Sequence, residues 1–153
     1  MTTTRTTQGR TPDAVTQFSV FTANRVGRLN DLIALLNANS VHVLAVTVLD
    51  ATDSAIMRVV VDDPQAARRL LQENDFPFNE CELLVVEFDD ATHFPKLMAA
   101  FLEAEVNLNY MYSFIPHPHG KSILGVKMED TEVGEKILTR HGFRVLRQSD
   151  ISR

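Results

Sequence analysis

The sequence carries an internal repeat, and this repeat limits the possible folds more than any single motif. Apolar positions of the first half recur 65 residues later in the second half. The matched pairs are Phe18 and Leu83, Val20 and Val85, Phe21 and Val86, Leu29 and Phe94, Leu32 and Leu97, Ala34 and Ala99, and Val41 and Val106. After a hairpin the offset becomes 67, as in Asp63 and Asp130, Leu70 and Ile137, Leu71 and Leu138, and Phe76 and Phe143. The repeat predicts two copies of one structural unit.

Each copy shows strand and helix signals in the order βαββαβ. β-Branched and aromatic runs indicate strands, and apolar residues at helical spacing indicate helices that begin and end at capping or turn residues. In the first copy the signals are a strand at Val15–Phe21, a helix from Leu29 to Leu36, a hairpin of Val41–Leu49 and Ala55–Val61, a helix from Pro64 to near Asn74, and a strand at Cys81–Phe88 that opens the second copy. Asp63 is expected to cap the second helix, with Pro64 at its first position.

This order predicts an α+β fold of two tandem ferredoxin-like βαββαβ units, with antiparallel sheets and helices on one face. We expect residues 1–12 to be a flexible tail, 13–80 the first unit and 81–150 the second. The second hairpin tip, Pro116–Gly120, is two residues longer than the first.

Two of the predicted strands carry apolar residues that suggest burial of the sheet face not covered by helices. Val41–Leu49 lacks the alternation of a strand with one wet face, which predicts that the helix-free face is partly covered. We therefore expect at least a homodimer, because monomers rarely expose large apolar patches. In the second copy Leu108, Tyr110, Tyr112 and Phe114 share one parity. This parity is most simply core, and a binding role for Tyr110 or Tyr112 is the alternative.

Composition narrows the partners and the compartment. The net charge is −5, and the 15 Lys and Arg residues form no dense cluster, which argues against nucleic-acid binding. Cys81 is the only cysteine, so a disulfide within the chain and a CxxC site are excluded, and a cytoplasmic protein is expected. No apolar run is long enough to span a bilayer, and residues 1–13 lack a signal core, so no membrane partner is expected.

The turn Asn24-Arg25-Val26-Gly27-Arg28-Leu29 lies where the first strand ends and the first helix begins. Backbone N–H groups in the first turn of a helix lack intrahelical partners, and the helix dipole adds partial positive charge there. Such a turn suits a carboxylate or phosphate, and Gly27 allows close approach of the backbone. A purely structural turn, with Asn24 as a cap, is the alternative.

These residues resemble a known family, the ACT domain, a small βαββαβ module that binds amino acids and related metabolites in regulatory proteins. The resemblance covers about Val15 to Asp150 as two tandem copies. The turn resembles the family's Asn-Arg-Pro-Gly-x-Leu, with Val26 where proline is commoner, and Val106-Asn107-Leu108 resembles its Val/Ile-Asn-Ile strand start. The run Asn107–Phe114 followed by Gly120-Lys121 resembles stand-alone tandem ACT proteins.

The resemblance implies a non-catalytic, allosteric amino-acid-binding protein with ligand at the seam between two units. It implies that Asn24 is the turn asparagine, Gly27 the turn glycine, and Asn107 the strand asparagine. The full expected set is Asn24, Arg25, Val26, Gly27, Arg28, Leu29, Asn107, Leu108 and Asn109. No cofactor and no metal are expected.

The two copies differ at these positions, which predicts one good site per chain. In the second copy Asp89, Thr92 and His93 stand for Asn24, Gly27 and Arg28, and His42 of the first copy stands for Asn107. The loop Asp89-Asp90 has lost its glycine and carries two acids that would repel a carboxylate. We expect the pairing of Asp89 with His42 to be a degenerate second site.

Three alternatives stay open at this stage. Acylphosphatases share the βαββαβ topology and place an anion-binding arginine in the same turn, where Arg25 or Arg28 could act, but the glycine-rich phosphate cradle is missing. His117 and His119 could hold a metal ion, although structural zinc usually has four ligands. The pair of units could also have lost its ligand and serve only to oligomerise or to dock on a metabolic enzyme.

Overall fold

A computed structural model describes residues 12–23, 27–116 and 118–152, and its first half forms one βαββαβ unit. The expected elements of this half are confirmed, with ends that differ by a few residues. They are β1 (Val15–Ala23), α1 (Arg28–Ala38), β2 (Val43–Asp50), β3 (Ser54–Val61), α2 (Pro64–Glu73) and β4 (Phe78–Phe88). The expected cap of α2 is also confirmed, because the Asp63 carboxylate accepts a hydrogen bond from Ala66 N at 3.1 Å.

The second half repeats the order with small additions. Its elements are the short 3₁₀ helix η1 (Ala91–His93), α3 (Phe94–Ala104), β5 (Leu108–Ser113), η2 (Pro118–Gly120), β6 (Ser122–Met128), α4 (Thr131–Arg140), β7 (Arg144–Leu146) and α5 (Gln148–Ile151). Asp130 caps α4 as Asp63 caps α2, through a hydrogen bond from Val133 N at 3.2 Å. The α+β fold of two tandem ferredoxin-like units is therefore confirmed.

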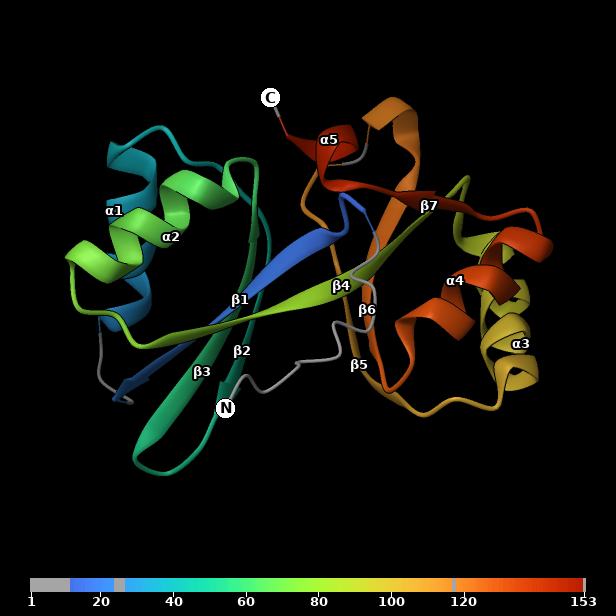
Figure 1. Cartoon of the computed structure of the whole chain (residues 1–153), viewed down its shortest axis with the longest axis horizontal. Coiled ribbons are helices and arrows are strands. Elements are labelled where there is room, and N and C mark those ends of the chain that lie inside the picture. The colour runs from blue at the N-terminus through green and yellow to red at the C-terminus, as the bar shows by residue number, and fades with distance from the viewer. Residues whose placement is uncertain (1–11, 24–26, 117, 153) are drawn as a thin grey trace, which may run out of the picture.

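The long strand β4 belongs to both units. All strand pairs are antiparallel, and the sheet has the order β2-β3-β1-β4-β6-β5 with β7 also on β4. The first half of β4, up to Leu83, pairs with β1, and the second half, from Leu84, pairs with β6 and β7. Figure 1 shows β4 crossing the molecule from the first pair of helices to the second. The strand therefore runs through the boundary expected between residues 80 and 81.

The four long helices cover the outer face of this sheet, and each unit has its own core there. Alternate residues of a strand point to opposite faces, so even-numbered residues of β4 point outward in both units. Phe78 of β4 packs against the core of the first unit, and Leu84, Val86 and Phe88 lie in the core of the second. Leu32 and Leu36 of α1, and Leu97 of α3, are at most 1% exposed. Leu32 and Leu97 are a matched pair of the sequence repeat. The matched strand residues Phe18 and Leu83, in contrast, lie on opposite faces of the sheet, because the two strands are out of register by one residue at an offset of 65.

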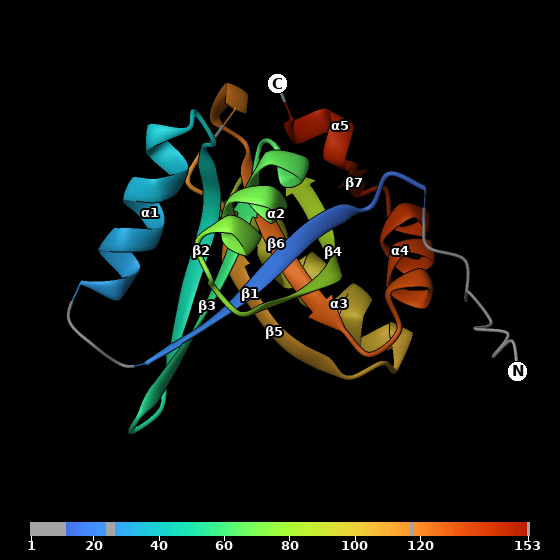
Figure 2. The same cartoon turned by 60° about the vertical axis from the view of Figure 1, so that its left-hand side comes forward.

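The helix-free face curls inward and forms a third core. Residues from both units meet there: Val15, Ala45, Val60, Leu83, Val85, Tyr112, Phe114, Ile123 and Leu146. The curl brings the edge strands together at one end, where Ala45 of β2 and Phe114 form a bridge and Ile115 N donates to Leu44 O at 2.8 Å. From that end β2 and β5 diverge (Figures 1 and 2). The expected cover of the helix-free face is thus supplied by the chain itself, so this face no longer requires a second copy.

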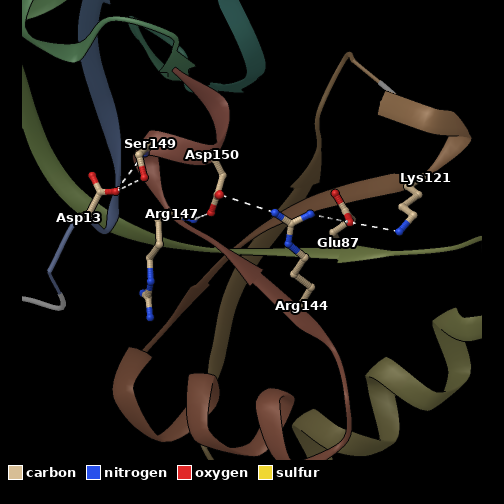
Figure 3. A network of polar contacts seen from close by, with 7 residues as sticks. All are labelled: Asp13, Glu87, Lys121, Arg144, Arg147, Ser149 and Asp150. Carbon is tan, nitrogen blue, oxygen red and sulfur yellow. Dashed lines mark hydrogen bonds and ion pairs between the residues drawn. The ribbon is translucent and has the colours of Figure 1, made fainter. Parts of the chain in front are cut away.

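The C-terminal segment ties the second unit to the start of β1. Gln148 of α5 donates its N–H to Asp13 O at 2.8 Å, and its side chain accepts from Thr16 N at 3.0 Å. The Asp13 carboxylate accepts hydrogen bonds from Ser149, and Arg144 lies between Glu87 and Asp150 at 3.4 and 3.5 Å (Figure 3). The sequence did not predict α5, because a four-residue helix carries too few positions to show a period.

Candidate functional site

The helix start at Gly27 has no side-chain cap among the described residues. Gly27 has φ 93° and ψ −14°, which is the left-handed region that favours glycine, and it is the N-cap residue of α1. No side chain among the described residues caps this helix, and a Cβ added at Gly27 would meet no atom within 4 Å. Asn24, Arg25 and Val26 lie outside the described residues. The first N–H groups of α1 therefore have no side-chain acceptor in the described part of the chain.

The two residues after Gly27 frame this helix start. The Arg28 guanidinium lies 4.6 Å from the centre of the Phe76 ring and 3.5 Å from the Asp31 carboxylate. Leu29 is 40% exposed, as is Phe94 at the start of α3 with 38%. The turn thus combines backbone donors that no described side chain caps, a positive side chain and an exposed apolar side chain.

The corresponding turn of the second unit is closed by its own carboxylate. Asp90 accepts hydrogen bonds from Thr92 N at 2.8 Å and from the Thr92 hydroxyl, and its Oδ1 lies 3.3 Å from His93 Nδ1. These hydrogen bonds, chiefly that of the Thr92 hydroxyl, hold the pKa of Asp90 below its ordinary value. Asp89 lies 3.7 Å from Lys121 Nζ. A ligand carboxylate would have to displace Asp90, whereas at Gly27 no described side chain accepts a hydrogen bond from the helix donors, although Asp31 lies in the same turn and contacts Arg28.

The strand asparagine and its counterpart make similar contacts. Asn107 donates its side-chain N–H to Glu129 Oε2 at 3.1 Å. His42, 65 positions earlier, places Nδ1 2.8 Å from Asp62 Oδ2, and its backbone N–H donates to the other oxygen at 2.8 Å. Asp62 is 67 positions before Glu129, so the contact is repeated in both units. Asn107, Leu108 and Asn109 are all exposed and accessible to a partner.

The chain does not bring its open turn and Asn107 together. Through the pairing of β5 with β6 and of β6 with β4, Asn107 lies level with the Thr16 end of β1. Gly27 follows Ala23 at the opposite end of β1, and seven residues of strand separate these ends by roughly 23 Å. Figures 1 and 2 both show the start of α1 and the start of β5 on opposite sides of the molecule.

The described residues give little support to the catalytic and metal alternatives. Of the two arginines considered for phosphate binding, Arg25 is outside the described residues and Arg28 already contacts Asp31. His117 is also outside them, and His119 is exposed in η2. Within the described ranges, no group of three or more His, Cys, Asp and Glu side chains could hold a metal ion. In the same part of the chain, no helix has the length and hydrophobicity that a membrane crossing requires.

Sequence reasoning missed two groups of polar residues. Sequence reasoning treats Asp90 only as an acid that repels a carboxylate. An Asp side chain commonly accepts a hydrogen bond from the backbone N–H two residues later, and this pattern could have identified Asp90 as the cap of its own turn. Sequence reasoning also passes over Gln17 inside the apolar first strand, and this residue is fully buried on the inner face of the sheet. An amide in the middle of a buried strand was the available signal, because buried polar groups require partners.

Two repeated units that share one curled sheet, with one helix start that no described side chain caps and one that is self-capped, define a tandem ferredoxin-like fold. The family model described as "ACT domain pair" matches residues 13–153. The chain therefore belongs to the ACT domain pair family. A comparison with curated proteins found no match.

Solved structures share this fold. Protein BT0572 from Bacteroides thetaiotaomicron is 22% identical, with a TM-score of 0.83 over 92% of this chain and 97% of that one. The regulatory subunit of aspartate kinase from Thermus thermophilus, in a ligand-free form, is 13% identical, with a TM-score of 0.62 over 85% and 91%. The corresponding subunit from Thermus flavus is 12% identical, with a TM-score of 0.57 over 84% and 93%.

Proposed function

We propose that this chain is a non-catalytic regulatory protein that binds a free amino acid at the start of α1. The observation that carries the proposal is the contrast between the two turns. The Gly27 turn leaves its helix donors uncapped by any described side chain, and the Asp90 turn fills the equivalent place with its own carboxylate. The ACT family is typically regulatory, and two neighbours of this fold are named as regulatory subunits of aspartate kinase.

An α-amino acid suits the chemistry of the Gly27 turn. Its carboxylate would accept hydrogen bonds from the N–H groups that follow Gly27, and the dipole of α1 favours that negative charge. Its ammonium needs acceptors, which the side-chain oxygens of Asn24 and Asn107 can supply. Its side chain would lie near Leu29, which is 40% exposed.

We further propose that Asn107 reaches this ligand from a second copy of the chain. Because Gly27 and Asn107 lie level with opposite ends of β1, they cannot form one site within a single chain. The pairing of the turn with Asn107 that the resemblance implies therefore requires a second molecule. Both half-sites expose a leucine, Leu29 at 40% beside the turn and Leu108 at 37% beside Asn107. A twofold arrangement would cover both leucines. It would create two equal seams in the dimer, each joining the turn of one copy to Asn107 of the other, so each chain would account for one site.

A thermal-shift screen of the twenty amino acids, followed by calorimetry on the best ligand, tests the proposal. Ligand at 100 times its dissociation constant should add about 2.7 kcal/mol to the free energy of unfolding. Asn24→Ala and Asn107→Ala should each weaken binding roughly tenfold to hundredfold, because each removes a hydrogen bond to a charged group. Asp89→Ala and His42→Ala, in the degenerate site, should leave binding unchanged.

Light scattering with and without the ligand tests the second copy. A dimer that binds one ligand per chain is expected. Mixing Asn24→Ala with Asn107→Ala chains should restore one intact seam in each mixed dimer. A monomer that binds with full affinity, or calorimetry that gives two equal sites per chain, would refute the arrangement.

The alternative is a module that docks on a metabolic enzyme and has no small ligand. Leu102 on α3, 80% exposed, and Ile115, 62% exposed, favour a protein contact on the second unit. The screen separates the two functions, because a docking module would show no stabilisation by any amino acid.

A further inference from the structure

The inner face of the curled sheet changes from apolar to polar along its strands. Near the Ala45–Phe114 bridge it is packed with the third core, and farther along it carries one polar residue from each of five strands. We call these five residues the polar ring: Gln17 of β1, Arg58 of β3, Cys81 of β4, Tyr110 of β5 and Lys127 of β6. Gln17 is opposite Cys81 in the sheet, and Tyr110 is opposite Lys127. The ring lies away from the bridge, because Arg58 is opposite Thr47 of β2 and Tyr110 is near the start of β5.

The neutral members of the ring are fixed by hydrogen bonds. The Gln17 amide donates to the Tyr110 hydroxyl at 2.7 Å and to Cys81 Sγ at 3.4 Å. The hydroxyl of Tyr112, the next tyrosine on β5, donates to the Gln17 oxygen at 2.6 Å. Because Gln17 comes from the first unit and both tyrosines from the second, these bonds hold the two halves of the inner face in a fixed position.

The two cations of the ring, in contrast, lack a negative partner among the described residues. The Arg58 guanidinium carbon lies 4.0 Å from the centre of the Tyr110 ring. Its Nε is buried and has no hydrogen-bond partner in the described part of the chain. Within those same ranges, neither Arg58 nor Lys127 forms an ion pair with an acidic side chain. Among the described residues, the partner of the Arg58 guanidinium is therefore the face of the Tyr110 ring.

The charges of both cations affect the pKa of the Cys81 thiol. Burial raises the pKa of this thiol, while the charges of Lys127 and Arg58 oppose that rise. The nearest acids on the same strand, Glu80 and Glu82, point to the other face because strand residues alternate. Glu80 indeed contacts Arg68 of α2 on the helix side at 2.9 Å. The ring itself therefore carries two positive charges in a chain whose net charge is −5. Glu129, which has the parity of Lys127, accepts a hydrogen bond from Asn107 at 3.1 Å.

We propose that the polar ring binds a small oxyanion, the carboxylate or phosphate group of a soluble molecule, between Arg58 and Lys127. A guanidinium can hold such a group through two parallel hydrogen bonds, and an ammonium adds a point charge. Arg58 belongs to the first unit and Lys127 to the second, so the anion links the two units across the inner face. This site is separate from the Gly27 turn and does not depend on it.

Calorimetry on the full chain tests the site with two probes, sodium phosphate and sodium acetate, at ionic strength held constant with chloride. One saturable site per chain is expected for phosphate, and the acetate titration shows whether a carboxylate is accepted as well. Arg58→Gln and Lys127→Gln should each weaken binding at least tenfold. Arg58→Lys should weaken it less, because it keeps the charge. Arg69→Gln, at an exposed arginine that lies 4.0 Å from Glu73, is the matched control and should bind normally.

The single cysteine gives a second readout. Saturating phosphate should slow alkylation of Cys81 in the wild type and leave the rate unchanged in Arg58→Gln. The proposal is overturned if neither anion gives a saturable heat, or if Arg58→Gln and Lys127→Gln bind as the wild type does. It is also overturned if Gly27→Ala abolishes phosphate binding while Arg58→Gln retains it, because the anion would then lie at the helix start.

Discussion

Gly27 is the single residue whose backbone conformation matters most to the proposed site. Its φ of 93° strains any other residue, although a Cβ there would have open space. Gly27→Ala should therefore cost about 1–2 kcal/mol of stability and should weaken amino-acid binding as the turn relaxes. Urea unfolding and calorimetry on the same sample measure both effects.

Gly142 offers a matched control for this change. It follows α4 and has φ 82°, and a Cβ added there would also meet no atom within 4 Å. Gly142→Ala should lose a similar amount of stability and keep the wild-type affinity for the amino acid. Equal loss of affinity in both variants would show that binding responds only to global stability.

Tyr112 should control the alkaline limit of stability. It is 9% exposed, and burial raises the pKa of its hydroxyl above the ordinary value of 10.0. Above pH 10 the unfolded chain loses this proton while the folded chain keeps it, so the stability that Tyr112 contributes below pH 10 is lost as the pH rises. The free energy of unfolding should fall by about 1.4 kcal/mol per pH unit from this group alone.

Urea unfolding between about pH 9.5 and 11 checks this dependence. Tyr112→Phe should be less stable than the wild type at neutral pH, because Gln17 loses a donor, and should lose less stability as the pH rises. Parallel curves for the two proteins would assign the alkaline loss to other groups.

At the scale of elements, two aspartates cap equivalent helices. Asp63 and Asp130 each accept a hydrogen bond from the N–H three residues later, at 3.1 and 3.2 Å. Asp63→Ala and Asp130→Ala should each lower the free energy of unfolding by about 0.5–2 kcal/mol. Denaturant titration measures the loss, and Asp53→Ala in the exposed first hairpin tip should change little.

The sequence was sufficient for these elements because their signals are local. Capping residues, helical spacing and apolar strands lie within a few residues of each other, and the repeat doubles each signal. The extent of β4 was not predictable in the same way. Its first residues, Phe78 to Glu80, carry one aromatic and polar neighbours, and they become strand only because β1 pairs with them. Pairing between distant segments overrides local composition there.

The candidate site shows the same limit at the scale of the whole molecule. The resemblance pairs the Gly27 turn with Asn107, but the geometry of one chain separates these two half-sites. Which half-sites meet depends on how two units are placed, and this placement follows from the shared strand β4 and the curl of the sheet. No motif within a single unit encodes that placement.

The shared strand also predicts how the molecule unfolds. Two units joined by a linker could unfold separately, but β4 is part of both sheets and the third core takes residues from both units. Exposing one half would strip the other of a strand partner and of buried apolar area. We therefore expect one cooperative transition for the whole chain.

Core truncations in each unit test this cooperativity. Leu36→Ala in the first unit and Leu97→Ala in the second should each cost about 2–5 kcal/mol, because both side chains are at most 1% exposed. The chain has no tryptophan, and its two tyrosines lie on β5 and contact Gln17 of β1, so tyrosine emission reports on the contact between the units while far-ultraviolet dichroism reports on the whole chain. In a cooperative molecule Leu36→Ala shifts the two signals to the same lower midpoint. Separate midpoints in that variant would show that the contact between the units opens in a different transition from the rest of the chain, and would contradict a single cooperative unit.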